Sequence, residues 1–265
     1  MTTTDQRTDH DTENRAPVAL VTGAGRRIGR AIALALARAG WDVAVHYRAS
    51  RPDAEEVARE IAALGRRAVL VHADLADEGA VNRLLPAAID ALGPVTCVVN
   101  NASLFDYDSA TDFTSARLDE HMRANVAAPL LLAQALHAQV PAGGQGVVVN
   151  LLDQKLYNLN PDYLSYTLSK AALHTATTML AQALAPKVRV VGVAPGITMV
   201  SGDQTEEGFA KAHAQTPLGR SSTPEDIAAA VLYAATARAV TGTTLLVDGG
   251  QHLLPLPRDV MFLAK

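Results

Sequence analysis

The hydrophobic positions of the chain form short β-branched runs that alternate with longer stretches of helical spacing. Runs that are apolar at nearly every position predict strands covered on both faces, as in a parallel sheet. The predicted strands are residues 18–21, 42–47, 68–72, 95–99, 146–151, 189–193 and 243–247. The predicted helices are residues 27–38, 54–64, 78–92, 122–140, 164–184 and 224–237. This alternation predicts one doubly wound α/β domain of the Rossmann type, with about seven parallel strands and helices on both faces.

Three segments lie outside this pattern. Residues 1–16 are polar, lack the apolar core of a secretory signal and are predicted to form a flexible tail, which leaves 17–265 as the folded domain. Residues 195–222 are too long for an ordinary connection, so we expect a lid or a substrate-binding loop there. The apolar stretch 251–263 is expected either to cap the substrate pocket of its own or a neighbouring subunit, or to pack on the domain.

Composition narrows the class of protein. The 265 residues are 49% hydrophobic and 19% charged with a net charge of −4, so no global charge recruits nucleic acid or an anionic membrane. No run approaches the roughly 18 apolar residues of a membrane helix. The single cysteine, Cys97, lies in an apolar run and is predicted to be a buried, inert thiol, and no metal-ligand cluster is expected. We therefore expect a soluble cytoplasmic protein with a small-molecule substrate.

A glycine-rich turn directly follows the first predicted strand and opens the first predicted helix. Gly23, Gly25 and Gly29 allow the backbone N–H groups to approach a pyrophosphate, and the helix N-terminus adds positive potential. Arg26, Arg27 and Ile28 belong to the same turn. Its position between a strand and a helix makes it a predicted dinucleotide-binding turn.

The end of the second predicted strand indicates which dinucleotide is bound. An NAD site places a carboxylate there for the ribose 2′-hydroxyl, but this segment reads His46, Tyr47, Arg48, Ala49, Ser50. The Arg48 guanidinium and the Ser50 hydroxyl suit a 2′-phosphate, with Arg26 as a second candidate for the same charge. The pattern therefore predicts NADP(H), with His46 and Tyr47 at the cofactor edge.

Tyr166 and Lys170 form the strongest chemical motif. A spacing of four puts both side chains on one face of a helix. A free tyrosine ionises near pH about 10, and a nearby ammonium is expected to lower that pKa. The pair therefore predicts an acid–base group.

Taken together, these motifs resemble the short-chain dehydrogenase/reductase family from Pro17 to about His252. The resemblance implies hydride transfer from nicotinamide to a carbonyl or imine carbon, with Tyr166 as the proton donor. Lys170 would hold the nicotinamide ribose, Asn125 would hold a water in the proton path, and Asp74 would contact the adenine. Further family positions along the cofactor are Leu75, Asn101, Ala102, Ser103, Pro195 and Gly196.

Two departures resemble one branch of that family, the pteridine reductases, which include the bacterial dihydromonapterin reductases. Asp153 stands thirteen residues before Tyr166, where the general family has a serine. An ionised carboxylate is a poor partner for a ketone that is being reduced, but a good one for the N–H groups of a pterin. Arg27 replaces a glycine of the usual turn and would be aimed at the pyrophosphate or the substrate.

Other residues match the same branch. Ser103 would contact the pterin and Phe105 would stack on it, while Tyr163, expected on the helix face of Tyr166, matches a pocket tyrosine. The resemblance implies NADPH-dependent reduction of a dihydropterin or dihydrofolate to the tetrahydro form by a homotetramer, with a dimer as the alternative. An ordinary carbonyl reductase acting on 3-oxoacyl or sugar substrates stays open as an alternative, as does a non-catalytic NADP(H)-binding regulator.

Overall fold

The computed structural model describes residues 15–200, 205–214 and 216–263. Most of the predicted polar tail, 1–16, lies outside these residues. The seven parallel strands are β1 (Val18–Val21), β2 (Asp42–Tyr47), β3 (Ala68–His72), β4 (Val95–Asn100), β5 (Gly146–Leu151), β6 (Val188–Pro195) and β7 (Thr244–Val247). They form a single sheet in the order β3-β2-β1-β4-β5-β6-β7. The predicted doubly wound fold is confirmed.

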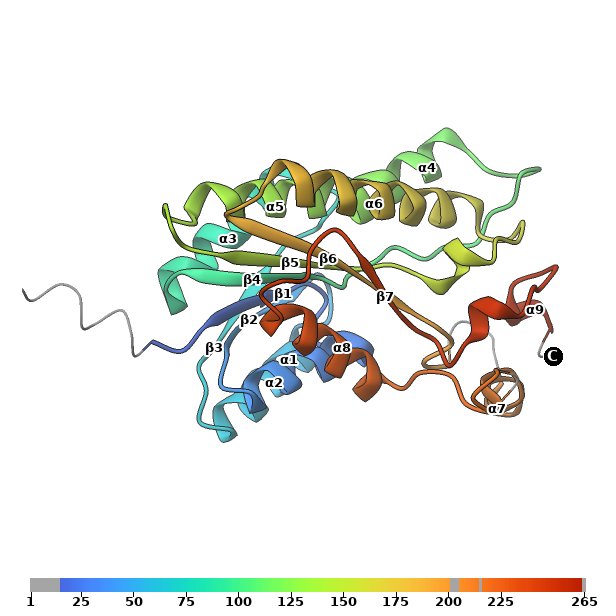
Figure 1. The fold of residues 1–265 in the computed structure, drawn as a ribbon, viewed down its shortest axis with the longest axis horizontal. Helices are drawn as coiled ribbons and strands as arrows, with labels where there is room; N and C mark the ends of the chain where they lie inside the picture. Colours follow the sequence, from blue (N-terminus) through green and yellow to red (C-terminus); the bar gives the residue numbers. More distant parts are fainter. Residues whose placement is uncertain (1–14, 201–204, 215, 264–265) are drawn as a thin grey trace, which may run out of the picture.

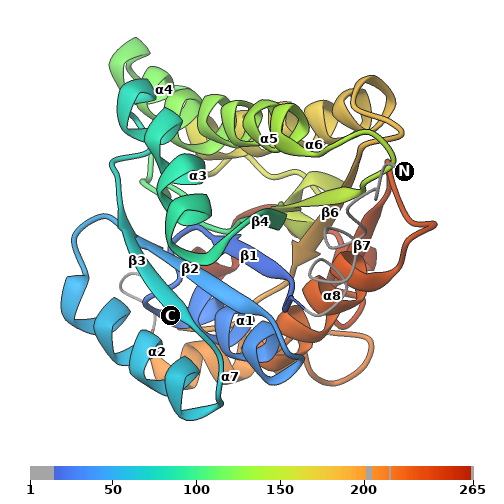
Figure 2. The ribbon, with the colours of Figure 1, turned by 90° about the vertical axis from the view of Figure 1, so that its left-hand side faces the viewer.

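Helices cover both faces of the sheet (Figures 1 and 2). On one face lie α1 (Arg27–Arg38), α2 (Arg51–Ala63) and α8 (Pro224–Thr236). On the other lie α3 (Glu78–Leu92), α5 (Ala128–Gln139) and α6 (Leu164–Ala183). None of the helices in the described ranges has the length and apolarity that crossing a membrane requires. Cys97 is fully buried in β4, and burial raises the pKa of its thiol to about 12, which confirms the predicted inert cysteine.

The helix predicted over residues 122–140 is longer and interrupted. It consists of α4 (Ser115–Met122), a π-helical turn η1 (Arg123–Ala127) and α5. Thr114 sets the earlier start, because its Oγ1 accepts a hydrogen bond from Arg117 N at 3.2 Å. Such π turns often mark functional sites, and this one contains the buried Asn125. Likewise α2 starts at Arg51 rather than at residue 54, with Pro52 in the first turn where no N–H is needed.

The segment 195–222, predicted to be irregular, contains the helix α7 (Glu206–Ala214). Thr205 begins it, since its Oγ1 accepts from Gly208 N at 3.0 Å. Helix α7 lies at the same end of the sheet as the short C-terminal helix α9 (Val260–Leu263) (Figure 1). Residues 201–204 and 215 of this segment lie outside the described residues.

The strand order brings the functional loops together. Strands β1, β4 and β5 are neighbours, and because they are parallel, their carboxyl ends share one edge of the sheet. The loops that follow them carry Gly23, Asn101 and Asp153. The fold thus places the glycine turn beside the predicted catalytic residues.

Candidate active site

The glycine turn after β1 is held closed by the loop after β4. Thr22 Oγ1 accepts hydrogen bonds from Asn101 N at 2.9 Å and Ala102 N at 3.0 Å, and Asn101 Nδ2 donates to Thr22 O at 2.9 Å. A Cβ on Gly29 would lie 2.1 Å from Gly23 O, so no side chain fits there. Helix α1 starts without a side-chain cap and without an acid in its first turn. Its N-terminal N–H groups are therefore available to bind an anionic ligand.

Arg27 adopts a backbone conformation that normally requires glycine. Its φ is 53°, in the left-handed region that explains why this position of the turn is usually a glycine. Its Nη1 donates to Val200 O at 2.8 Å. Arg27 therefore connects the glycine turn to the segment that follows β6.

His46 lies beneath the glycine turn. Only 1% of the residue is exposed, Gly23 N donates to its Nδ1 at 2.9 Å, and its Nε2 is 3.2 Å from Ala73 O. Burial lowers the pKa of His46 to about 4, so the ring is neutral and carries its proton on Nε2. His46, which was predicted at the cofactor edge, thus holds the backbone of the glycine turn in place through Gly23.

This arrangement predicts a loss of stability in mild acid. The folded-state pKa of His46 (about 4) is below its ordinary 6.5, so protonation favours the unfolded chain as the pH falls from 6.5 toward 4. We expect His46 to lower the free energy of unfolding by up to about 1.4 kcal/mol per pH unit in that window. Urea unfolding at several pH values should show a flatter dependence in His46→Asn, whereas His137→Asn on α5 should match the wild type. An unchanged slope in His46→Asn would contradict this role.

A cavity of about 450 Å³ lies over the glycine turn. The predicted cofactor residues that line it are Gly23, Gly25, Arg26, Arg27, Ile28, Gly29, His46, Tyr47, Arg48, Ser50, Asp74, Leu75, Asn101, Ala102 and Ser103. Arg26 is ion-paired with Asp53 at 2.6 Å. Asp53 follows residues 46–50, the end of β2 and its loop, in which no acid occurs. Arg48 is therefore the better candidate for the 2′-phosphate.

A second cavity, of about 460 Å³, adjoins the first, because Arg27, Ile28, Asn101 and Ser103 line both. The predicted residues Phe105, Asp153, Tyr166, Lys170, Pro195 and Gly196 line this second cavity. Pro195 and Gly196, predicted to contact the cofactor, thus lie on the side of the catalytic groups. A ligand that spans both cavities would place one end beside Tyr166.

Three side chains, one from the loop after β5 and two from α6, meet in the second cavity. Tyr166 Oη donates to Asp153 Oδ2 at 2.7 Å, and Lys170 Nζ donates to Leu151 O at 2.7 Å. Lys170 Nζ lies 5.7 Å from the centre of the Tyr166 ring. The spacing of four in the sequence does place Tyr166 and Lys170 on the same helix face.

The prediction that the pKa of Tyr166 is lowered is wrong. Burial, and then the Asp153 carboxylate, raise the pKa of Tyr166 well above its ordinary 10.0. The Asp153 carboxylate accepts a hydrogen bond from the phenol. Burial also raises the pKa of Asp153 and lowers that of Lys170 to about 8. Tyr166 is therefore a protonated donor in this structure.

Asn125 uses its side chain to hold the loop after β4. Its Oδ1 accepts from Leu104 N at 2.8 Å, and its Nδ2 donates to Leu104 O and Ser169 Oγ, each at 2.9 Å. The structure thus shows a positioning contact between this loop and helix α6. The role expected from the family, holding a water, stays a prediction.

Phe105 and Tyr163 form an aromatic wall. Their rings stack at 4.4 Å, and the Phe105 ring meets the Tyr166 ring edge-on at 4.6 Å. Phe105 is 40% exposed and lines the second cavity. Tyr163 immediately precedes α6 as its N-cap residue with a φ of 55°, and its ring and that of Tyr166 both contact Phe105. The Tyr163 ring thus packs behind Phe105.

Sequence reasoning missed several residues of the second cavity. These are Gln154, Lys155, Ile197, Thr198, Met199, Gln251, Asp259 and Val260. Lys155 and Asp259 are 104 positions apart and form an ion pair at 3.2 Å. A loop lysine and a C-terminal aspartate give no pattern that links them. Asp259 and Val260 of the apolar C-terminal stretch line this cavity of their own chain, and the alternative of a neighbouring subunit's pocket stays a prediction.

Comparison with known proteins agrees with this geometry. Residues 23–252 match the sequence family described as enoyl-(acyl carrier protein) reductase. An uncharacterized oxidoreductase of Methylorubrum extorquens is 36% identical over 241 residues, which cover 88% of this chain and 96% of that protein. This chain belongs to the short-chain dehydrogenase/reductase family.

Two further relatives of this short-chain dehydrogenase/reductase differ in their described activity. The crystal structure of FolM alternative dihydrofolate reductase 1 from Brucella suis in complex with NADP matches with a TM-score of 0.86 and 41% identity, over 90% of this chain and 96% of that chain. The 3-oxoacyl-[acyl-carrier-protein] reductase of Synechocystis is 34% identical over 89% of this chain and 96% of that protein. The chain is thus an oxidoreductase.

The first cavity fits NADP(H), the cofactor of this short-chain dehydrogenase/reductase. The uncapped α1 N-terminus and the turn without a side chain at Gly29 suit a pyrophosphate, and Arg48 with Ser50 suits a 2′-phosphate. The predicted cofactor is confirmed. The individual contacts stay predictions.

Arg48→Ala should shift the cofactor preference of this reductase. A guanidinium–phosphate contact adds charge-assisted hydrogen bonds that NADH cannot form, so we expect the KM for NADPH to rise by about tenfold or more and that for NADH to change little. Steady-state kinetics with both cofactors provide the measurement. Arg59→Ala on the outer surface of α2 serves as the control. Equal changes with both cofactors would contradict a 2′-phosphate contact.

Proposed function

We propose that this chain uses NADPH to reduce a dihydropterin, of the dihydrobiopterin, dihydromonapterin or dihydrofolate type, to its tetrahydro form. The observation that carries the proposal is Asp153, which replaces the family serine and is hydrogen-bonded to Tyr166 at 2.7 Å. An ionised carboxylate there would repel the oxyanion that forms from a ketone. A carboxyl group suits the N–H groups and ring nitrogens of a pterin.

Two observations support the same substrate class. Phe105, backed by Tyr163, offers an aromatic surface to the second cavity, and a planar heterocycle favours such a surface. The 41% identical Brucella suis protein is described as an alternative dihydrofolate reductase. Both features agree with the chemistry of Asp153.

The proposed reaction divides between the cofactor and the chain. NADPH, when bound, supplies a hydride to the carbon of a C=N bond. The nitrogen of that bond then needs a proton, which the hydrogen-bonded pair of Asp153 and Tyr166 holds in the cavity. Asp153 gives the proton to the nitrogen, and Tyr166 Oη stabilises the carboxylate that remains. Lys170 adds positive charge beside this pair. The Phe105 ring packs against the flat face of the heterocycle and orients it.

The direct test follows NADPH oxidation by the purified protein. Dihydrobiopterin, dihydromonapterin and dihydrofolate are compared with a panel of simple ketones. We expect turnover that depends on the pterin. Turnover on ketones alone would reject the pterin assignment and support the second candidate.

The second candidate is a carbonyl reductase of the same family. It is favoured by the relative described as a 3-oxoacyl-[acyl-carrier-protein] reductase, which is 34% identical. In that case Asp153 would be tolerated without bonding to the substrate. Tight NADPH binding without turnover of any compound in the panel would instead favour a regulator.

We also propose that the protein is a homotetramer. Helix α6 exposes Leu168 (47%) and Met179 (63%), which indicates that a partner covers this surface. Sedimentation velocity gives the mass of the assembly directly. A monomer at micromolar concentration would contradict the proposal.

A further inference from the structure

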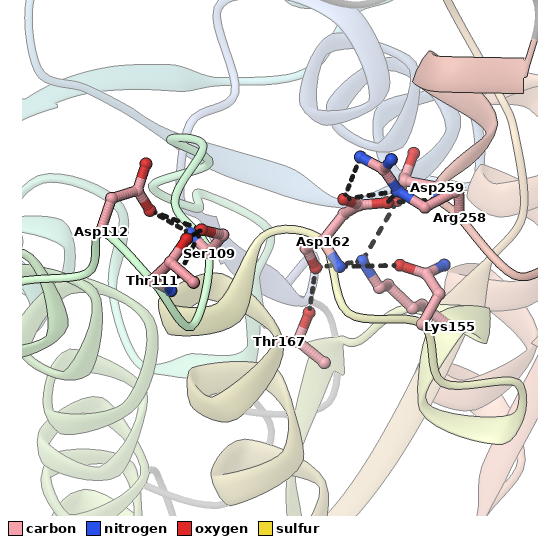
Figure 3. A network of polar contacts seen from close by, with 9 residues as sticks. Ser109, Thr111, Asp112, Lys155, Asp162, Thr167, Arg258 and Asp259 are labelled. Carbon is pink, nitrogen blue, oxygen red and sulfur yellow. Dashed lines mark hydrogen bonds and ion pairs between the residues drawn. The ribbon is translucent and has the colours of Figure 1, made fainter.

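Residues 254–263, here called the C-terminal strap, are bound to the segment before the catalytic helix α6. Arg258 Nε and Nη2 donate to both carboxylate oxygens of Asp162 at 2.8–3.0 Å, and Asp259 N donates to Asp162 Oδ2 at 2.7 Å (Figure 3). Phe262 packs 5.3 Å from the Tyr107 ring and 6.3 Å from the Tyr163 ring. These contacts hold the strap in one position over the second cavity.

The strap brings Asp259 into the lining of that cavity. Its Oδ2 lies 3.2 Å from Lys155 Nζ, which also donates to Asp162 O at 2.5 Å (Figure 3). The Lys155 side chain is 4% exposed and the Asp259 side chain 16%. A buried ammonium needs a partner of opposite charge, so Lys155 holds the Asp259 carboxylate in place. A carboxylate has about four acceptor positions, so it can accept hydrogen bonds from more than one partner.

A second acceptor lines the same cavity. Gln154 Oε1 is buried and has no hydrogen-bond partner within the described part of the chain. Buried polar atoms are nearly always hydrogen-bonded, and an exception requires an explanation. A ligand N–H group that enters the cavity would supply the missing donor. The cavity thus combines a charged and a neutral acceptor, separate from Asp153.

We infer that Asp259 and Gln154 bind the amino-bearing edge of the substrate heterocycle, while Asp153 and Tyr166 act at its reacting end. The inference rests on the proposed function, because a pterin carries an exocyclic amino group beside a ring N–H. Both groups donate hydrogen bonds. The C-terminal strap therefore contributes to substrate specificity from within the same chain.

The test compares two ligands and two full-length variants. The dissociation constants of a pterin and of a matched pteridine without the exocyclic amino group are measured by calorimetry in the presence of NADP⁺. In Asp259→Asn we expect the pterin to bind about tenfold more weakly, because a charge-assisted hydrogen bond is lost, and the amino-free ligand to change less than about twofold. The KM for the dihydropterin should rise with it, while kcat and the KM for NADPH stay within about threefold.

Gln154→Met provides a second test in case Asp259→Asn does not fold, because it leaves the ion pair between Lys155 and Asp259 intact. It removes the orphaned acceptor at similar volume, so we expect selective weakening of the pterin with thermal stability equal to or above that of the wild type. Asp90→Asn on the outer surface of α3 is the matched carboxylate control and should change neither ligand.

The outcomes separate this inference from the proposed function. Equal weakening of both ligands, or no weakening in either variant, would show that the strap is only structural and overturn the inference. Pterin turnover by the wild type would still stand in those cases. A wild type that neither binds nor reduces any pterin would overturn the proposed function, and this inference with it.

Discussion

Tyr166→Phe is expected to lower kcat for the dihydropterin by about 10²–10⁴-fold, the usual contribution of a positioned acid–base group. The substitution removes the hydroxyl that donates to Asp153 at 2.7 Å and leaves the packing of the ring against Phe105. Binding of NADPH should change by less than about twofold, since Tyr166 lies in the second cavity and does not line the first. Stopped-flow kinetics and a cofactor titration measure the two quantities.

Tyr157→Phe is the matched control. Tyr157 is 41% exposed on η2 (Gln154–Tyr157), with its hydroxyl 3.3 Å from His174 Nε2, and it does not line either cavity. It should keep the wild-type kcat. A Tyr166→Phe variant with more than about a tenth of the wild-type kcat would remove Tyr166 from the proton path.

Asp153→Asn is expected to reduce kcat/KM for the dihydropterin by at least about 100-fold, because an amide cannot give a proton to a ring nitrogen. The same substitution should stabilise the fold at neutral pH. Burial raises the folded-state pKa of Asp153 above its ordinary 3.8, so the ionised carboxyl destabilises the protein once the pH rises through the folded-state pKa. Steady-state kinetics and thermal unfolding at pH 7 measure both effects.

Asp153→Ser serves as the companion variant. It restores the hydroxyl of the general family, so we expect pterin turnover to fall as in Asp153→Asn while reduction of simple ketones rises. Leu132→Ile, at a buried position of α5 that lines neither cavity, should affect neither activity strongly. Full pterin activity in Asp153→Asn would contradict the assigned role, and a loss of stability would contradict the cost of the buried charge.

The two largest effects concern groups whose positions depend on different parts of the fold. Tyr166 and Lys170 share one helix, so local geometry alone sets their relation. Asp153 follows a different element, β5, and reaches Tyr166 only because that strand and α6 pack together in the tertiary structure. The acid–base pair of the proposed reaction is therefore a tertiary feature.

The sequence by itself determined the fold class and the glycine turn. Apolar runs at strand spacing, alternating with helical stretches, predicted the parallel sheet with its helical layers, and Gly23, Gly25 and Gly29 were found where a strand meets a helix. These features depend on neighbours within a few residues, where periodicity and backbone sterics act directly. The position of Asp153 relative to Tyr166 could also be counted along the chain.

Only the tertiary structure decided the charge states and the far wall of the cavity. The pKa of Tyr166 is raised because burial and Asp153 outweigh Lys170, a balance of distances and solvent exposure that no motif contains. Asp259 reaches the cavity because Arg258 is bound to Asp162, 96 positions away along the chain. Desolvation and long-range contacts are set when the chain packs, and so they are decided by the three-dimensional fold.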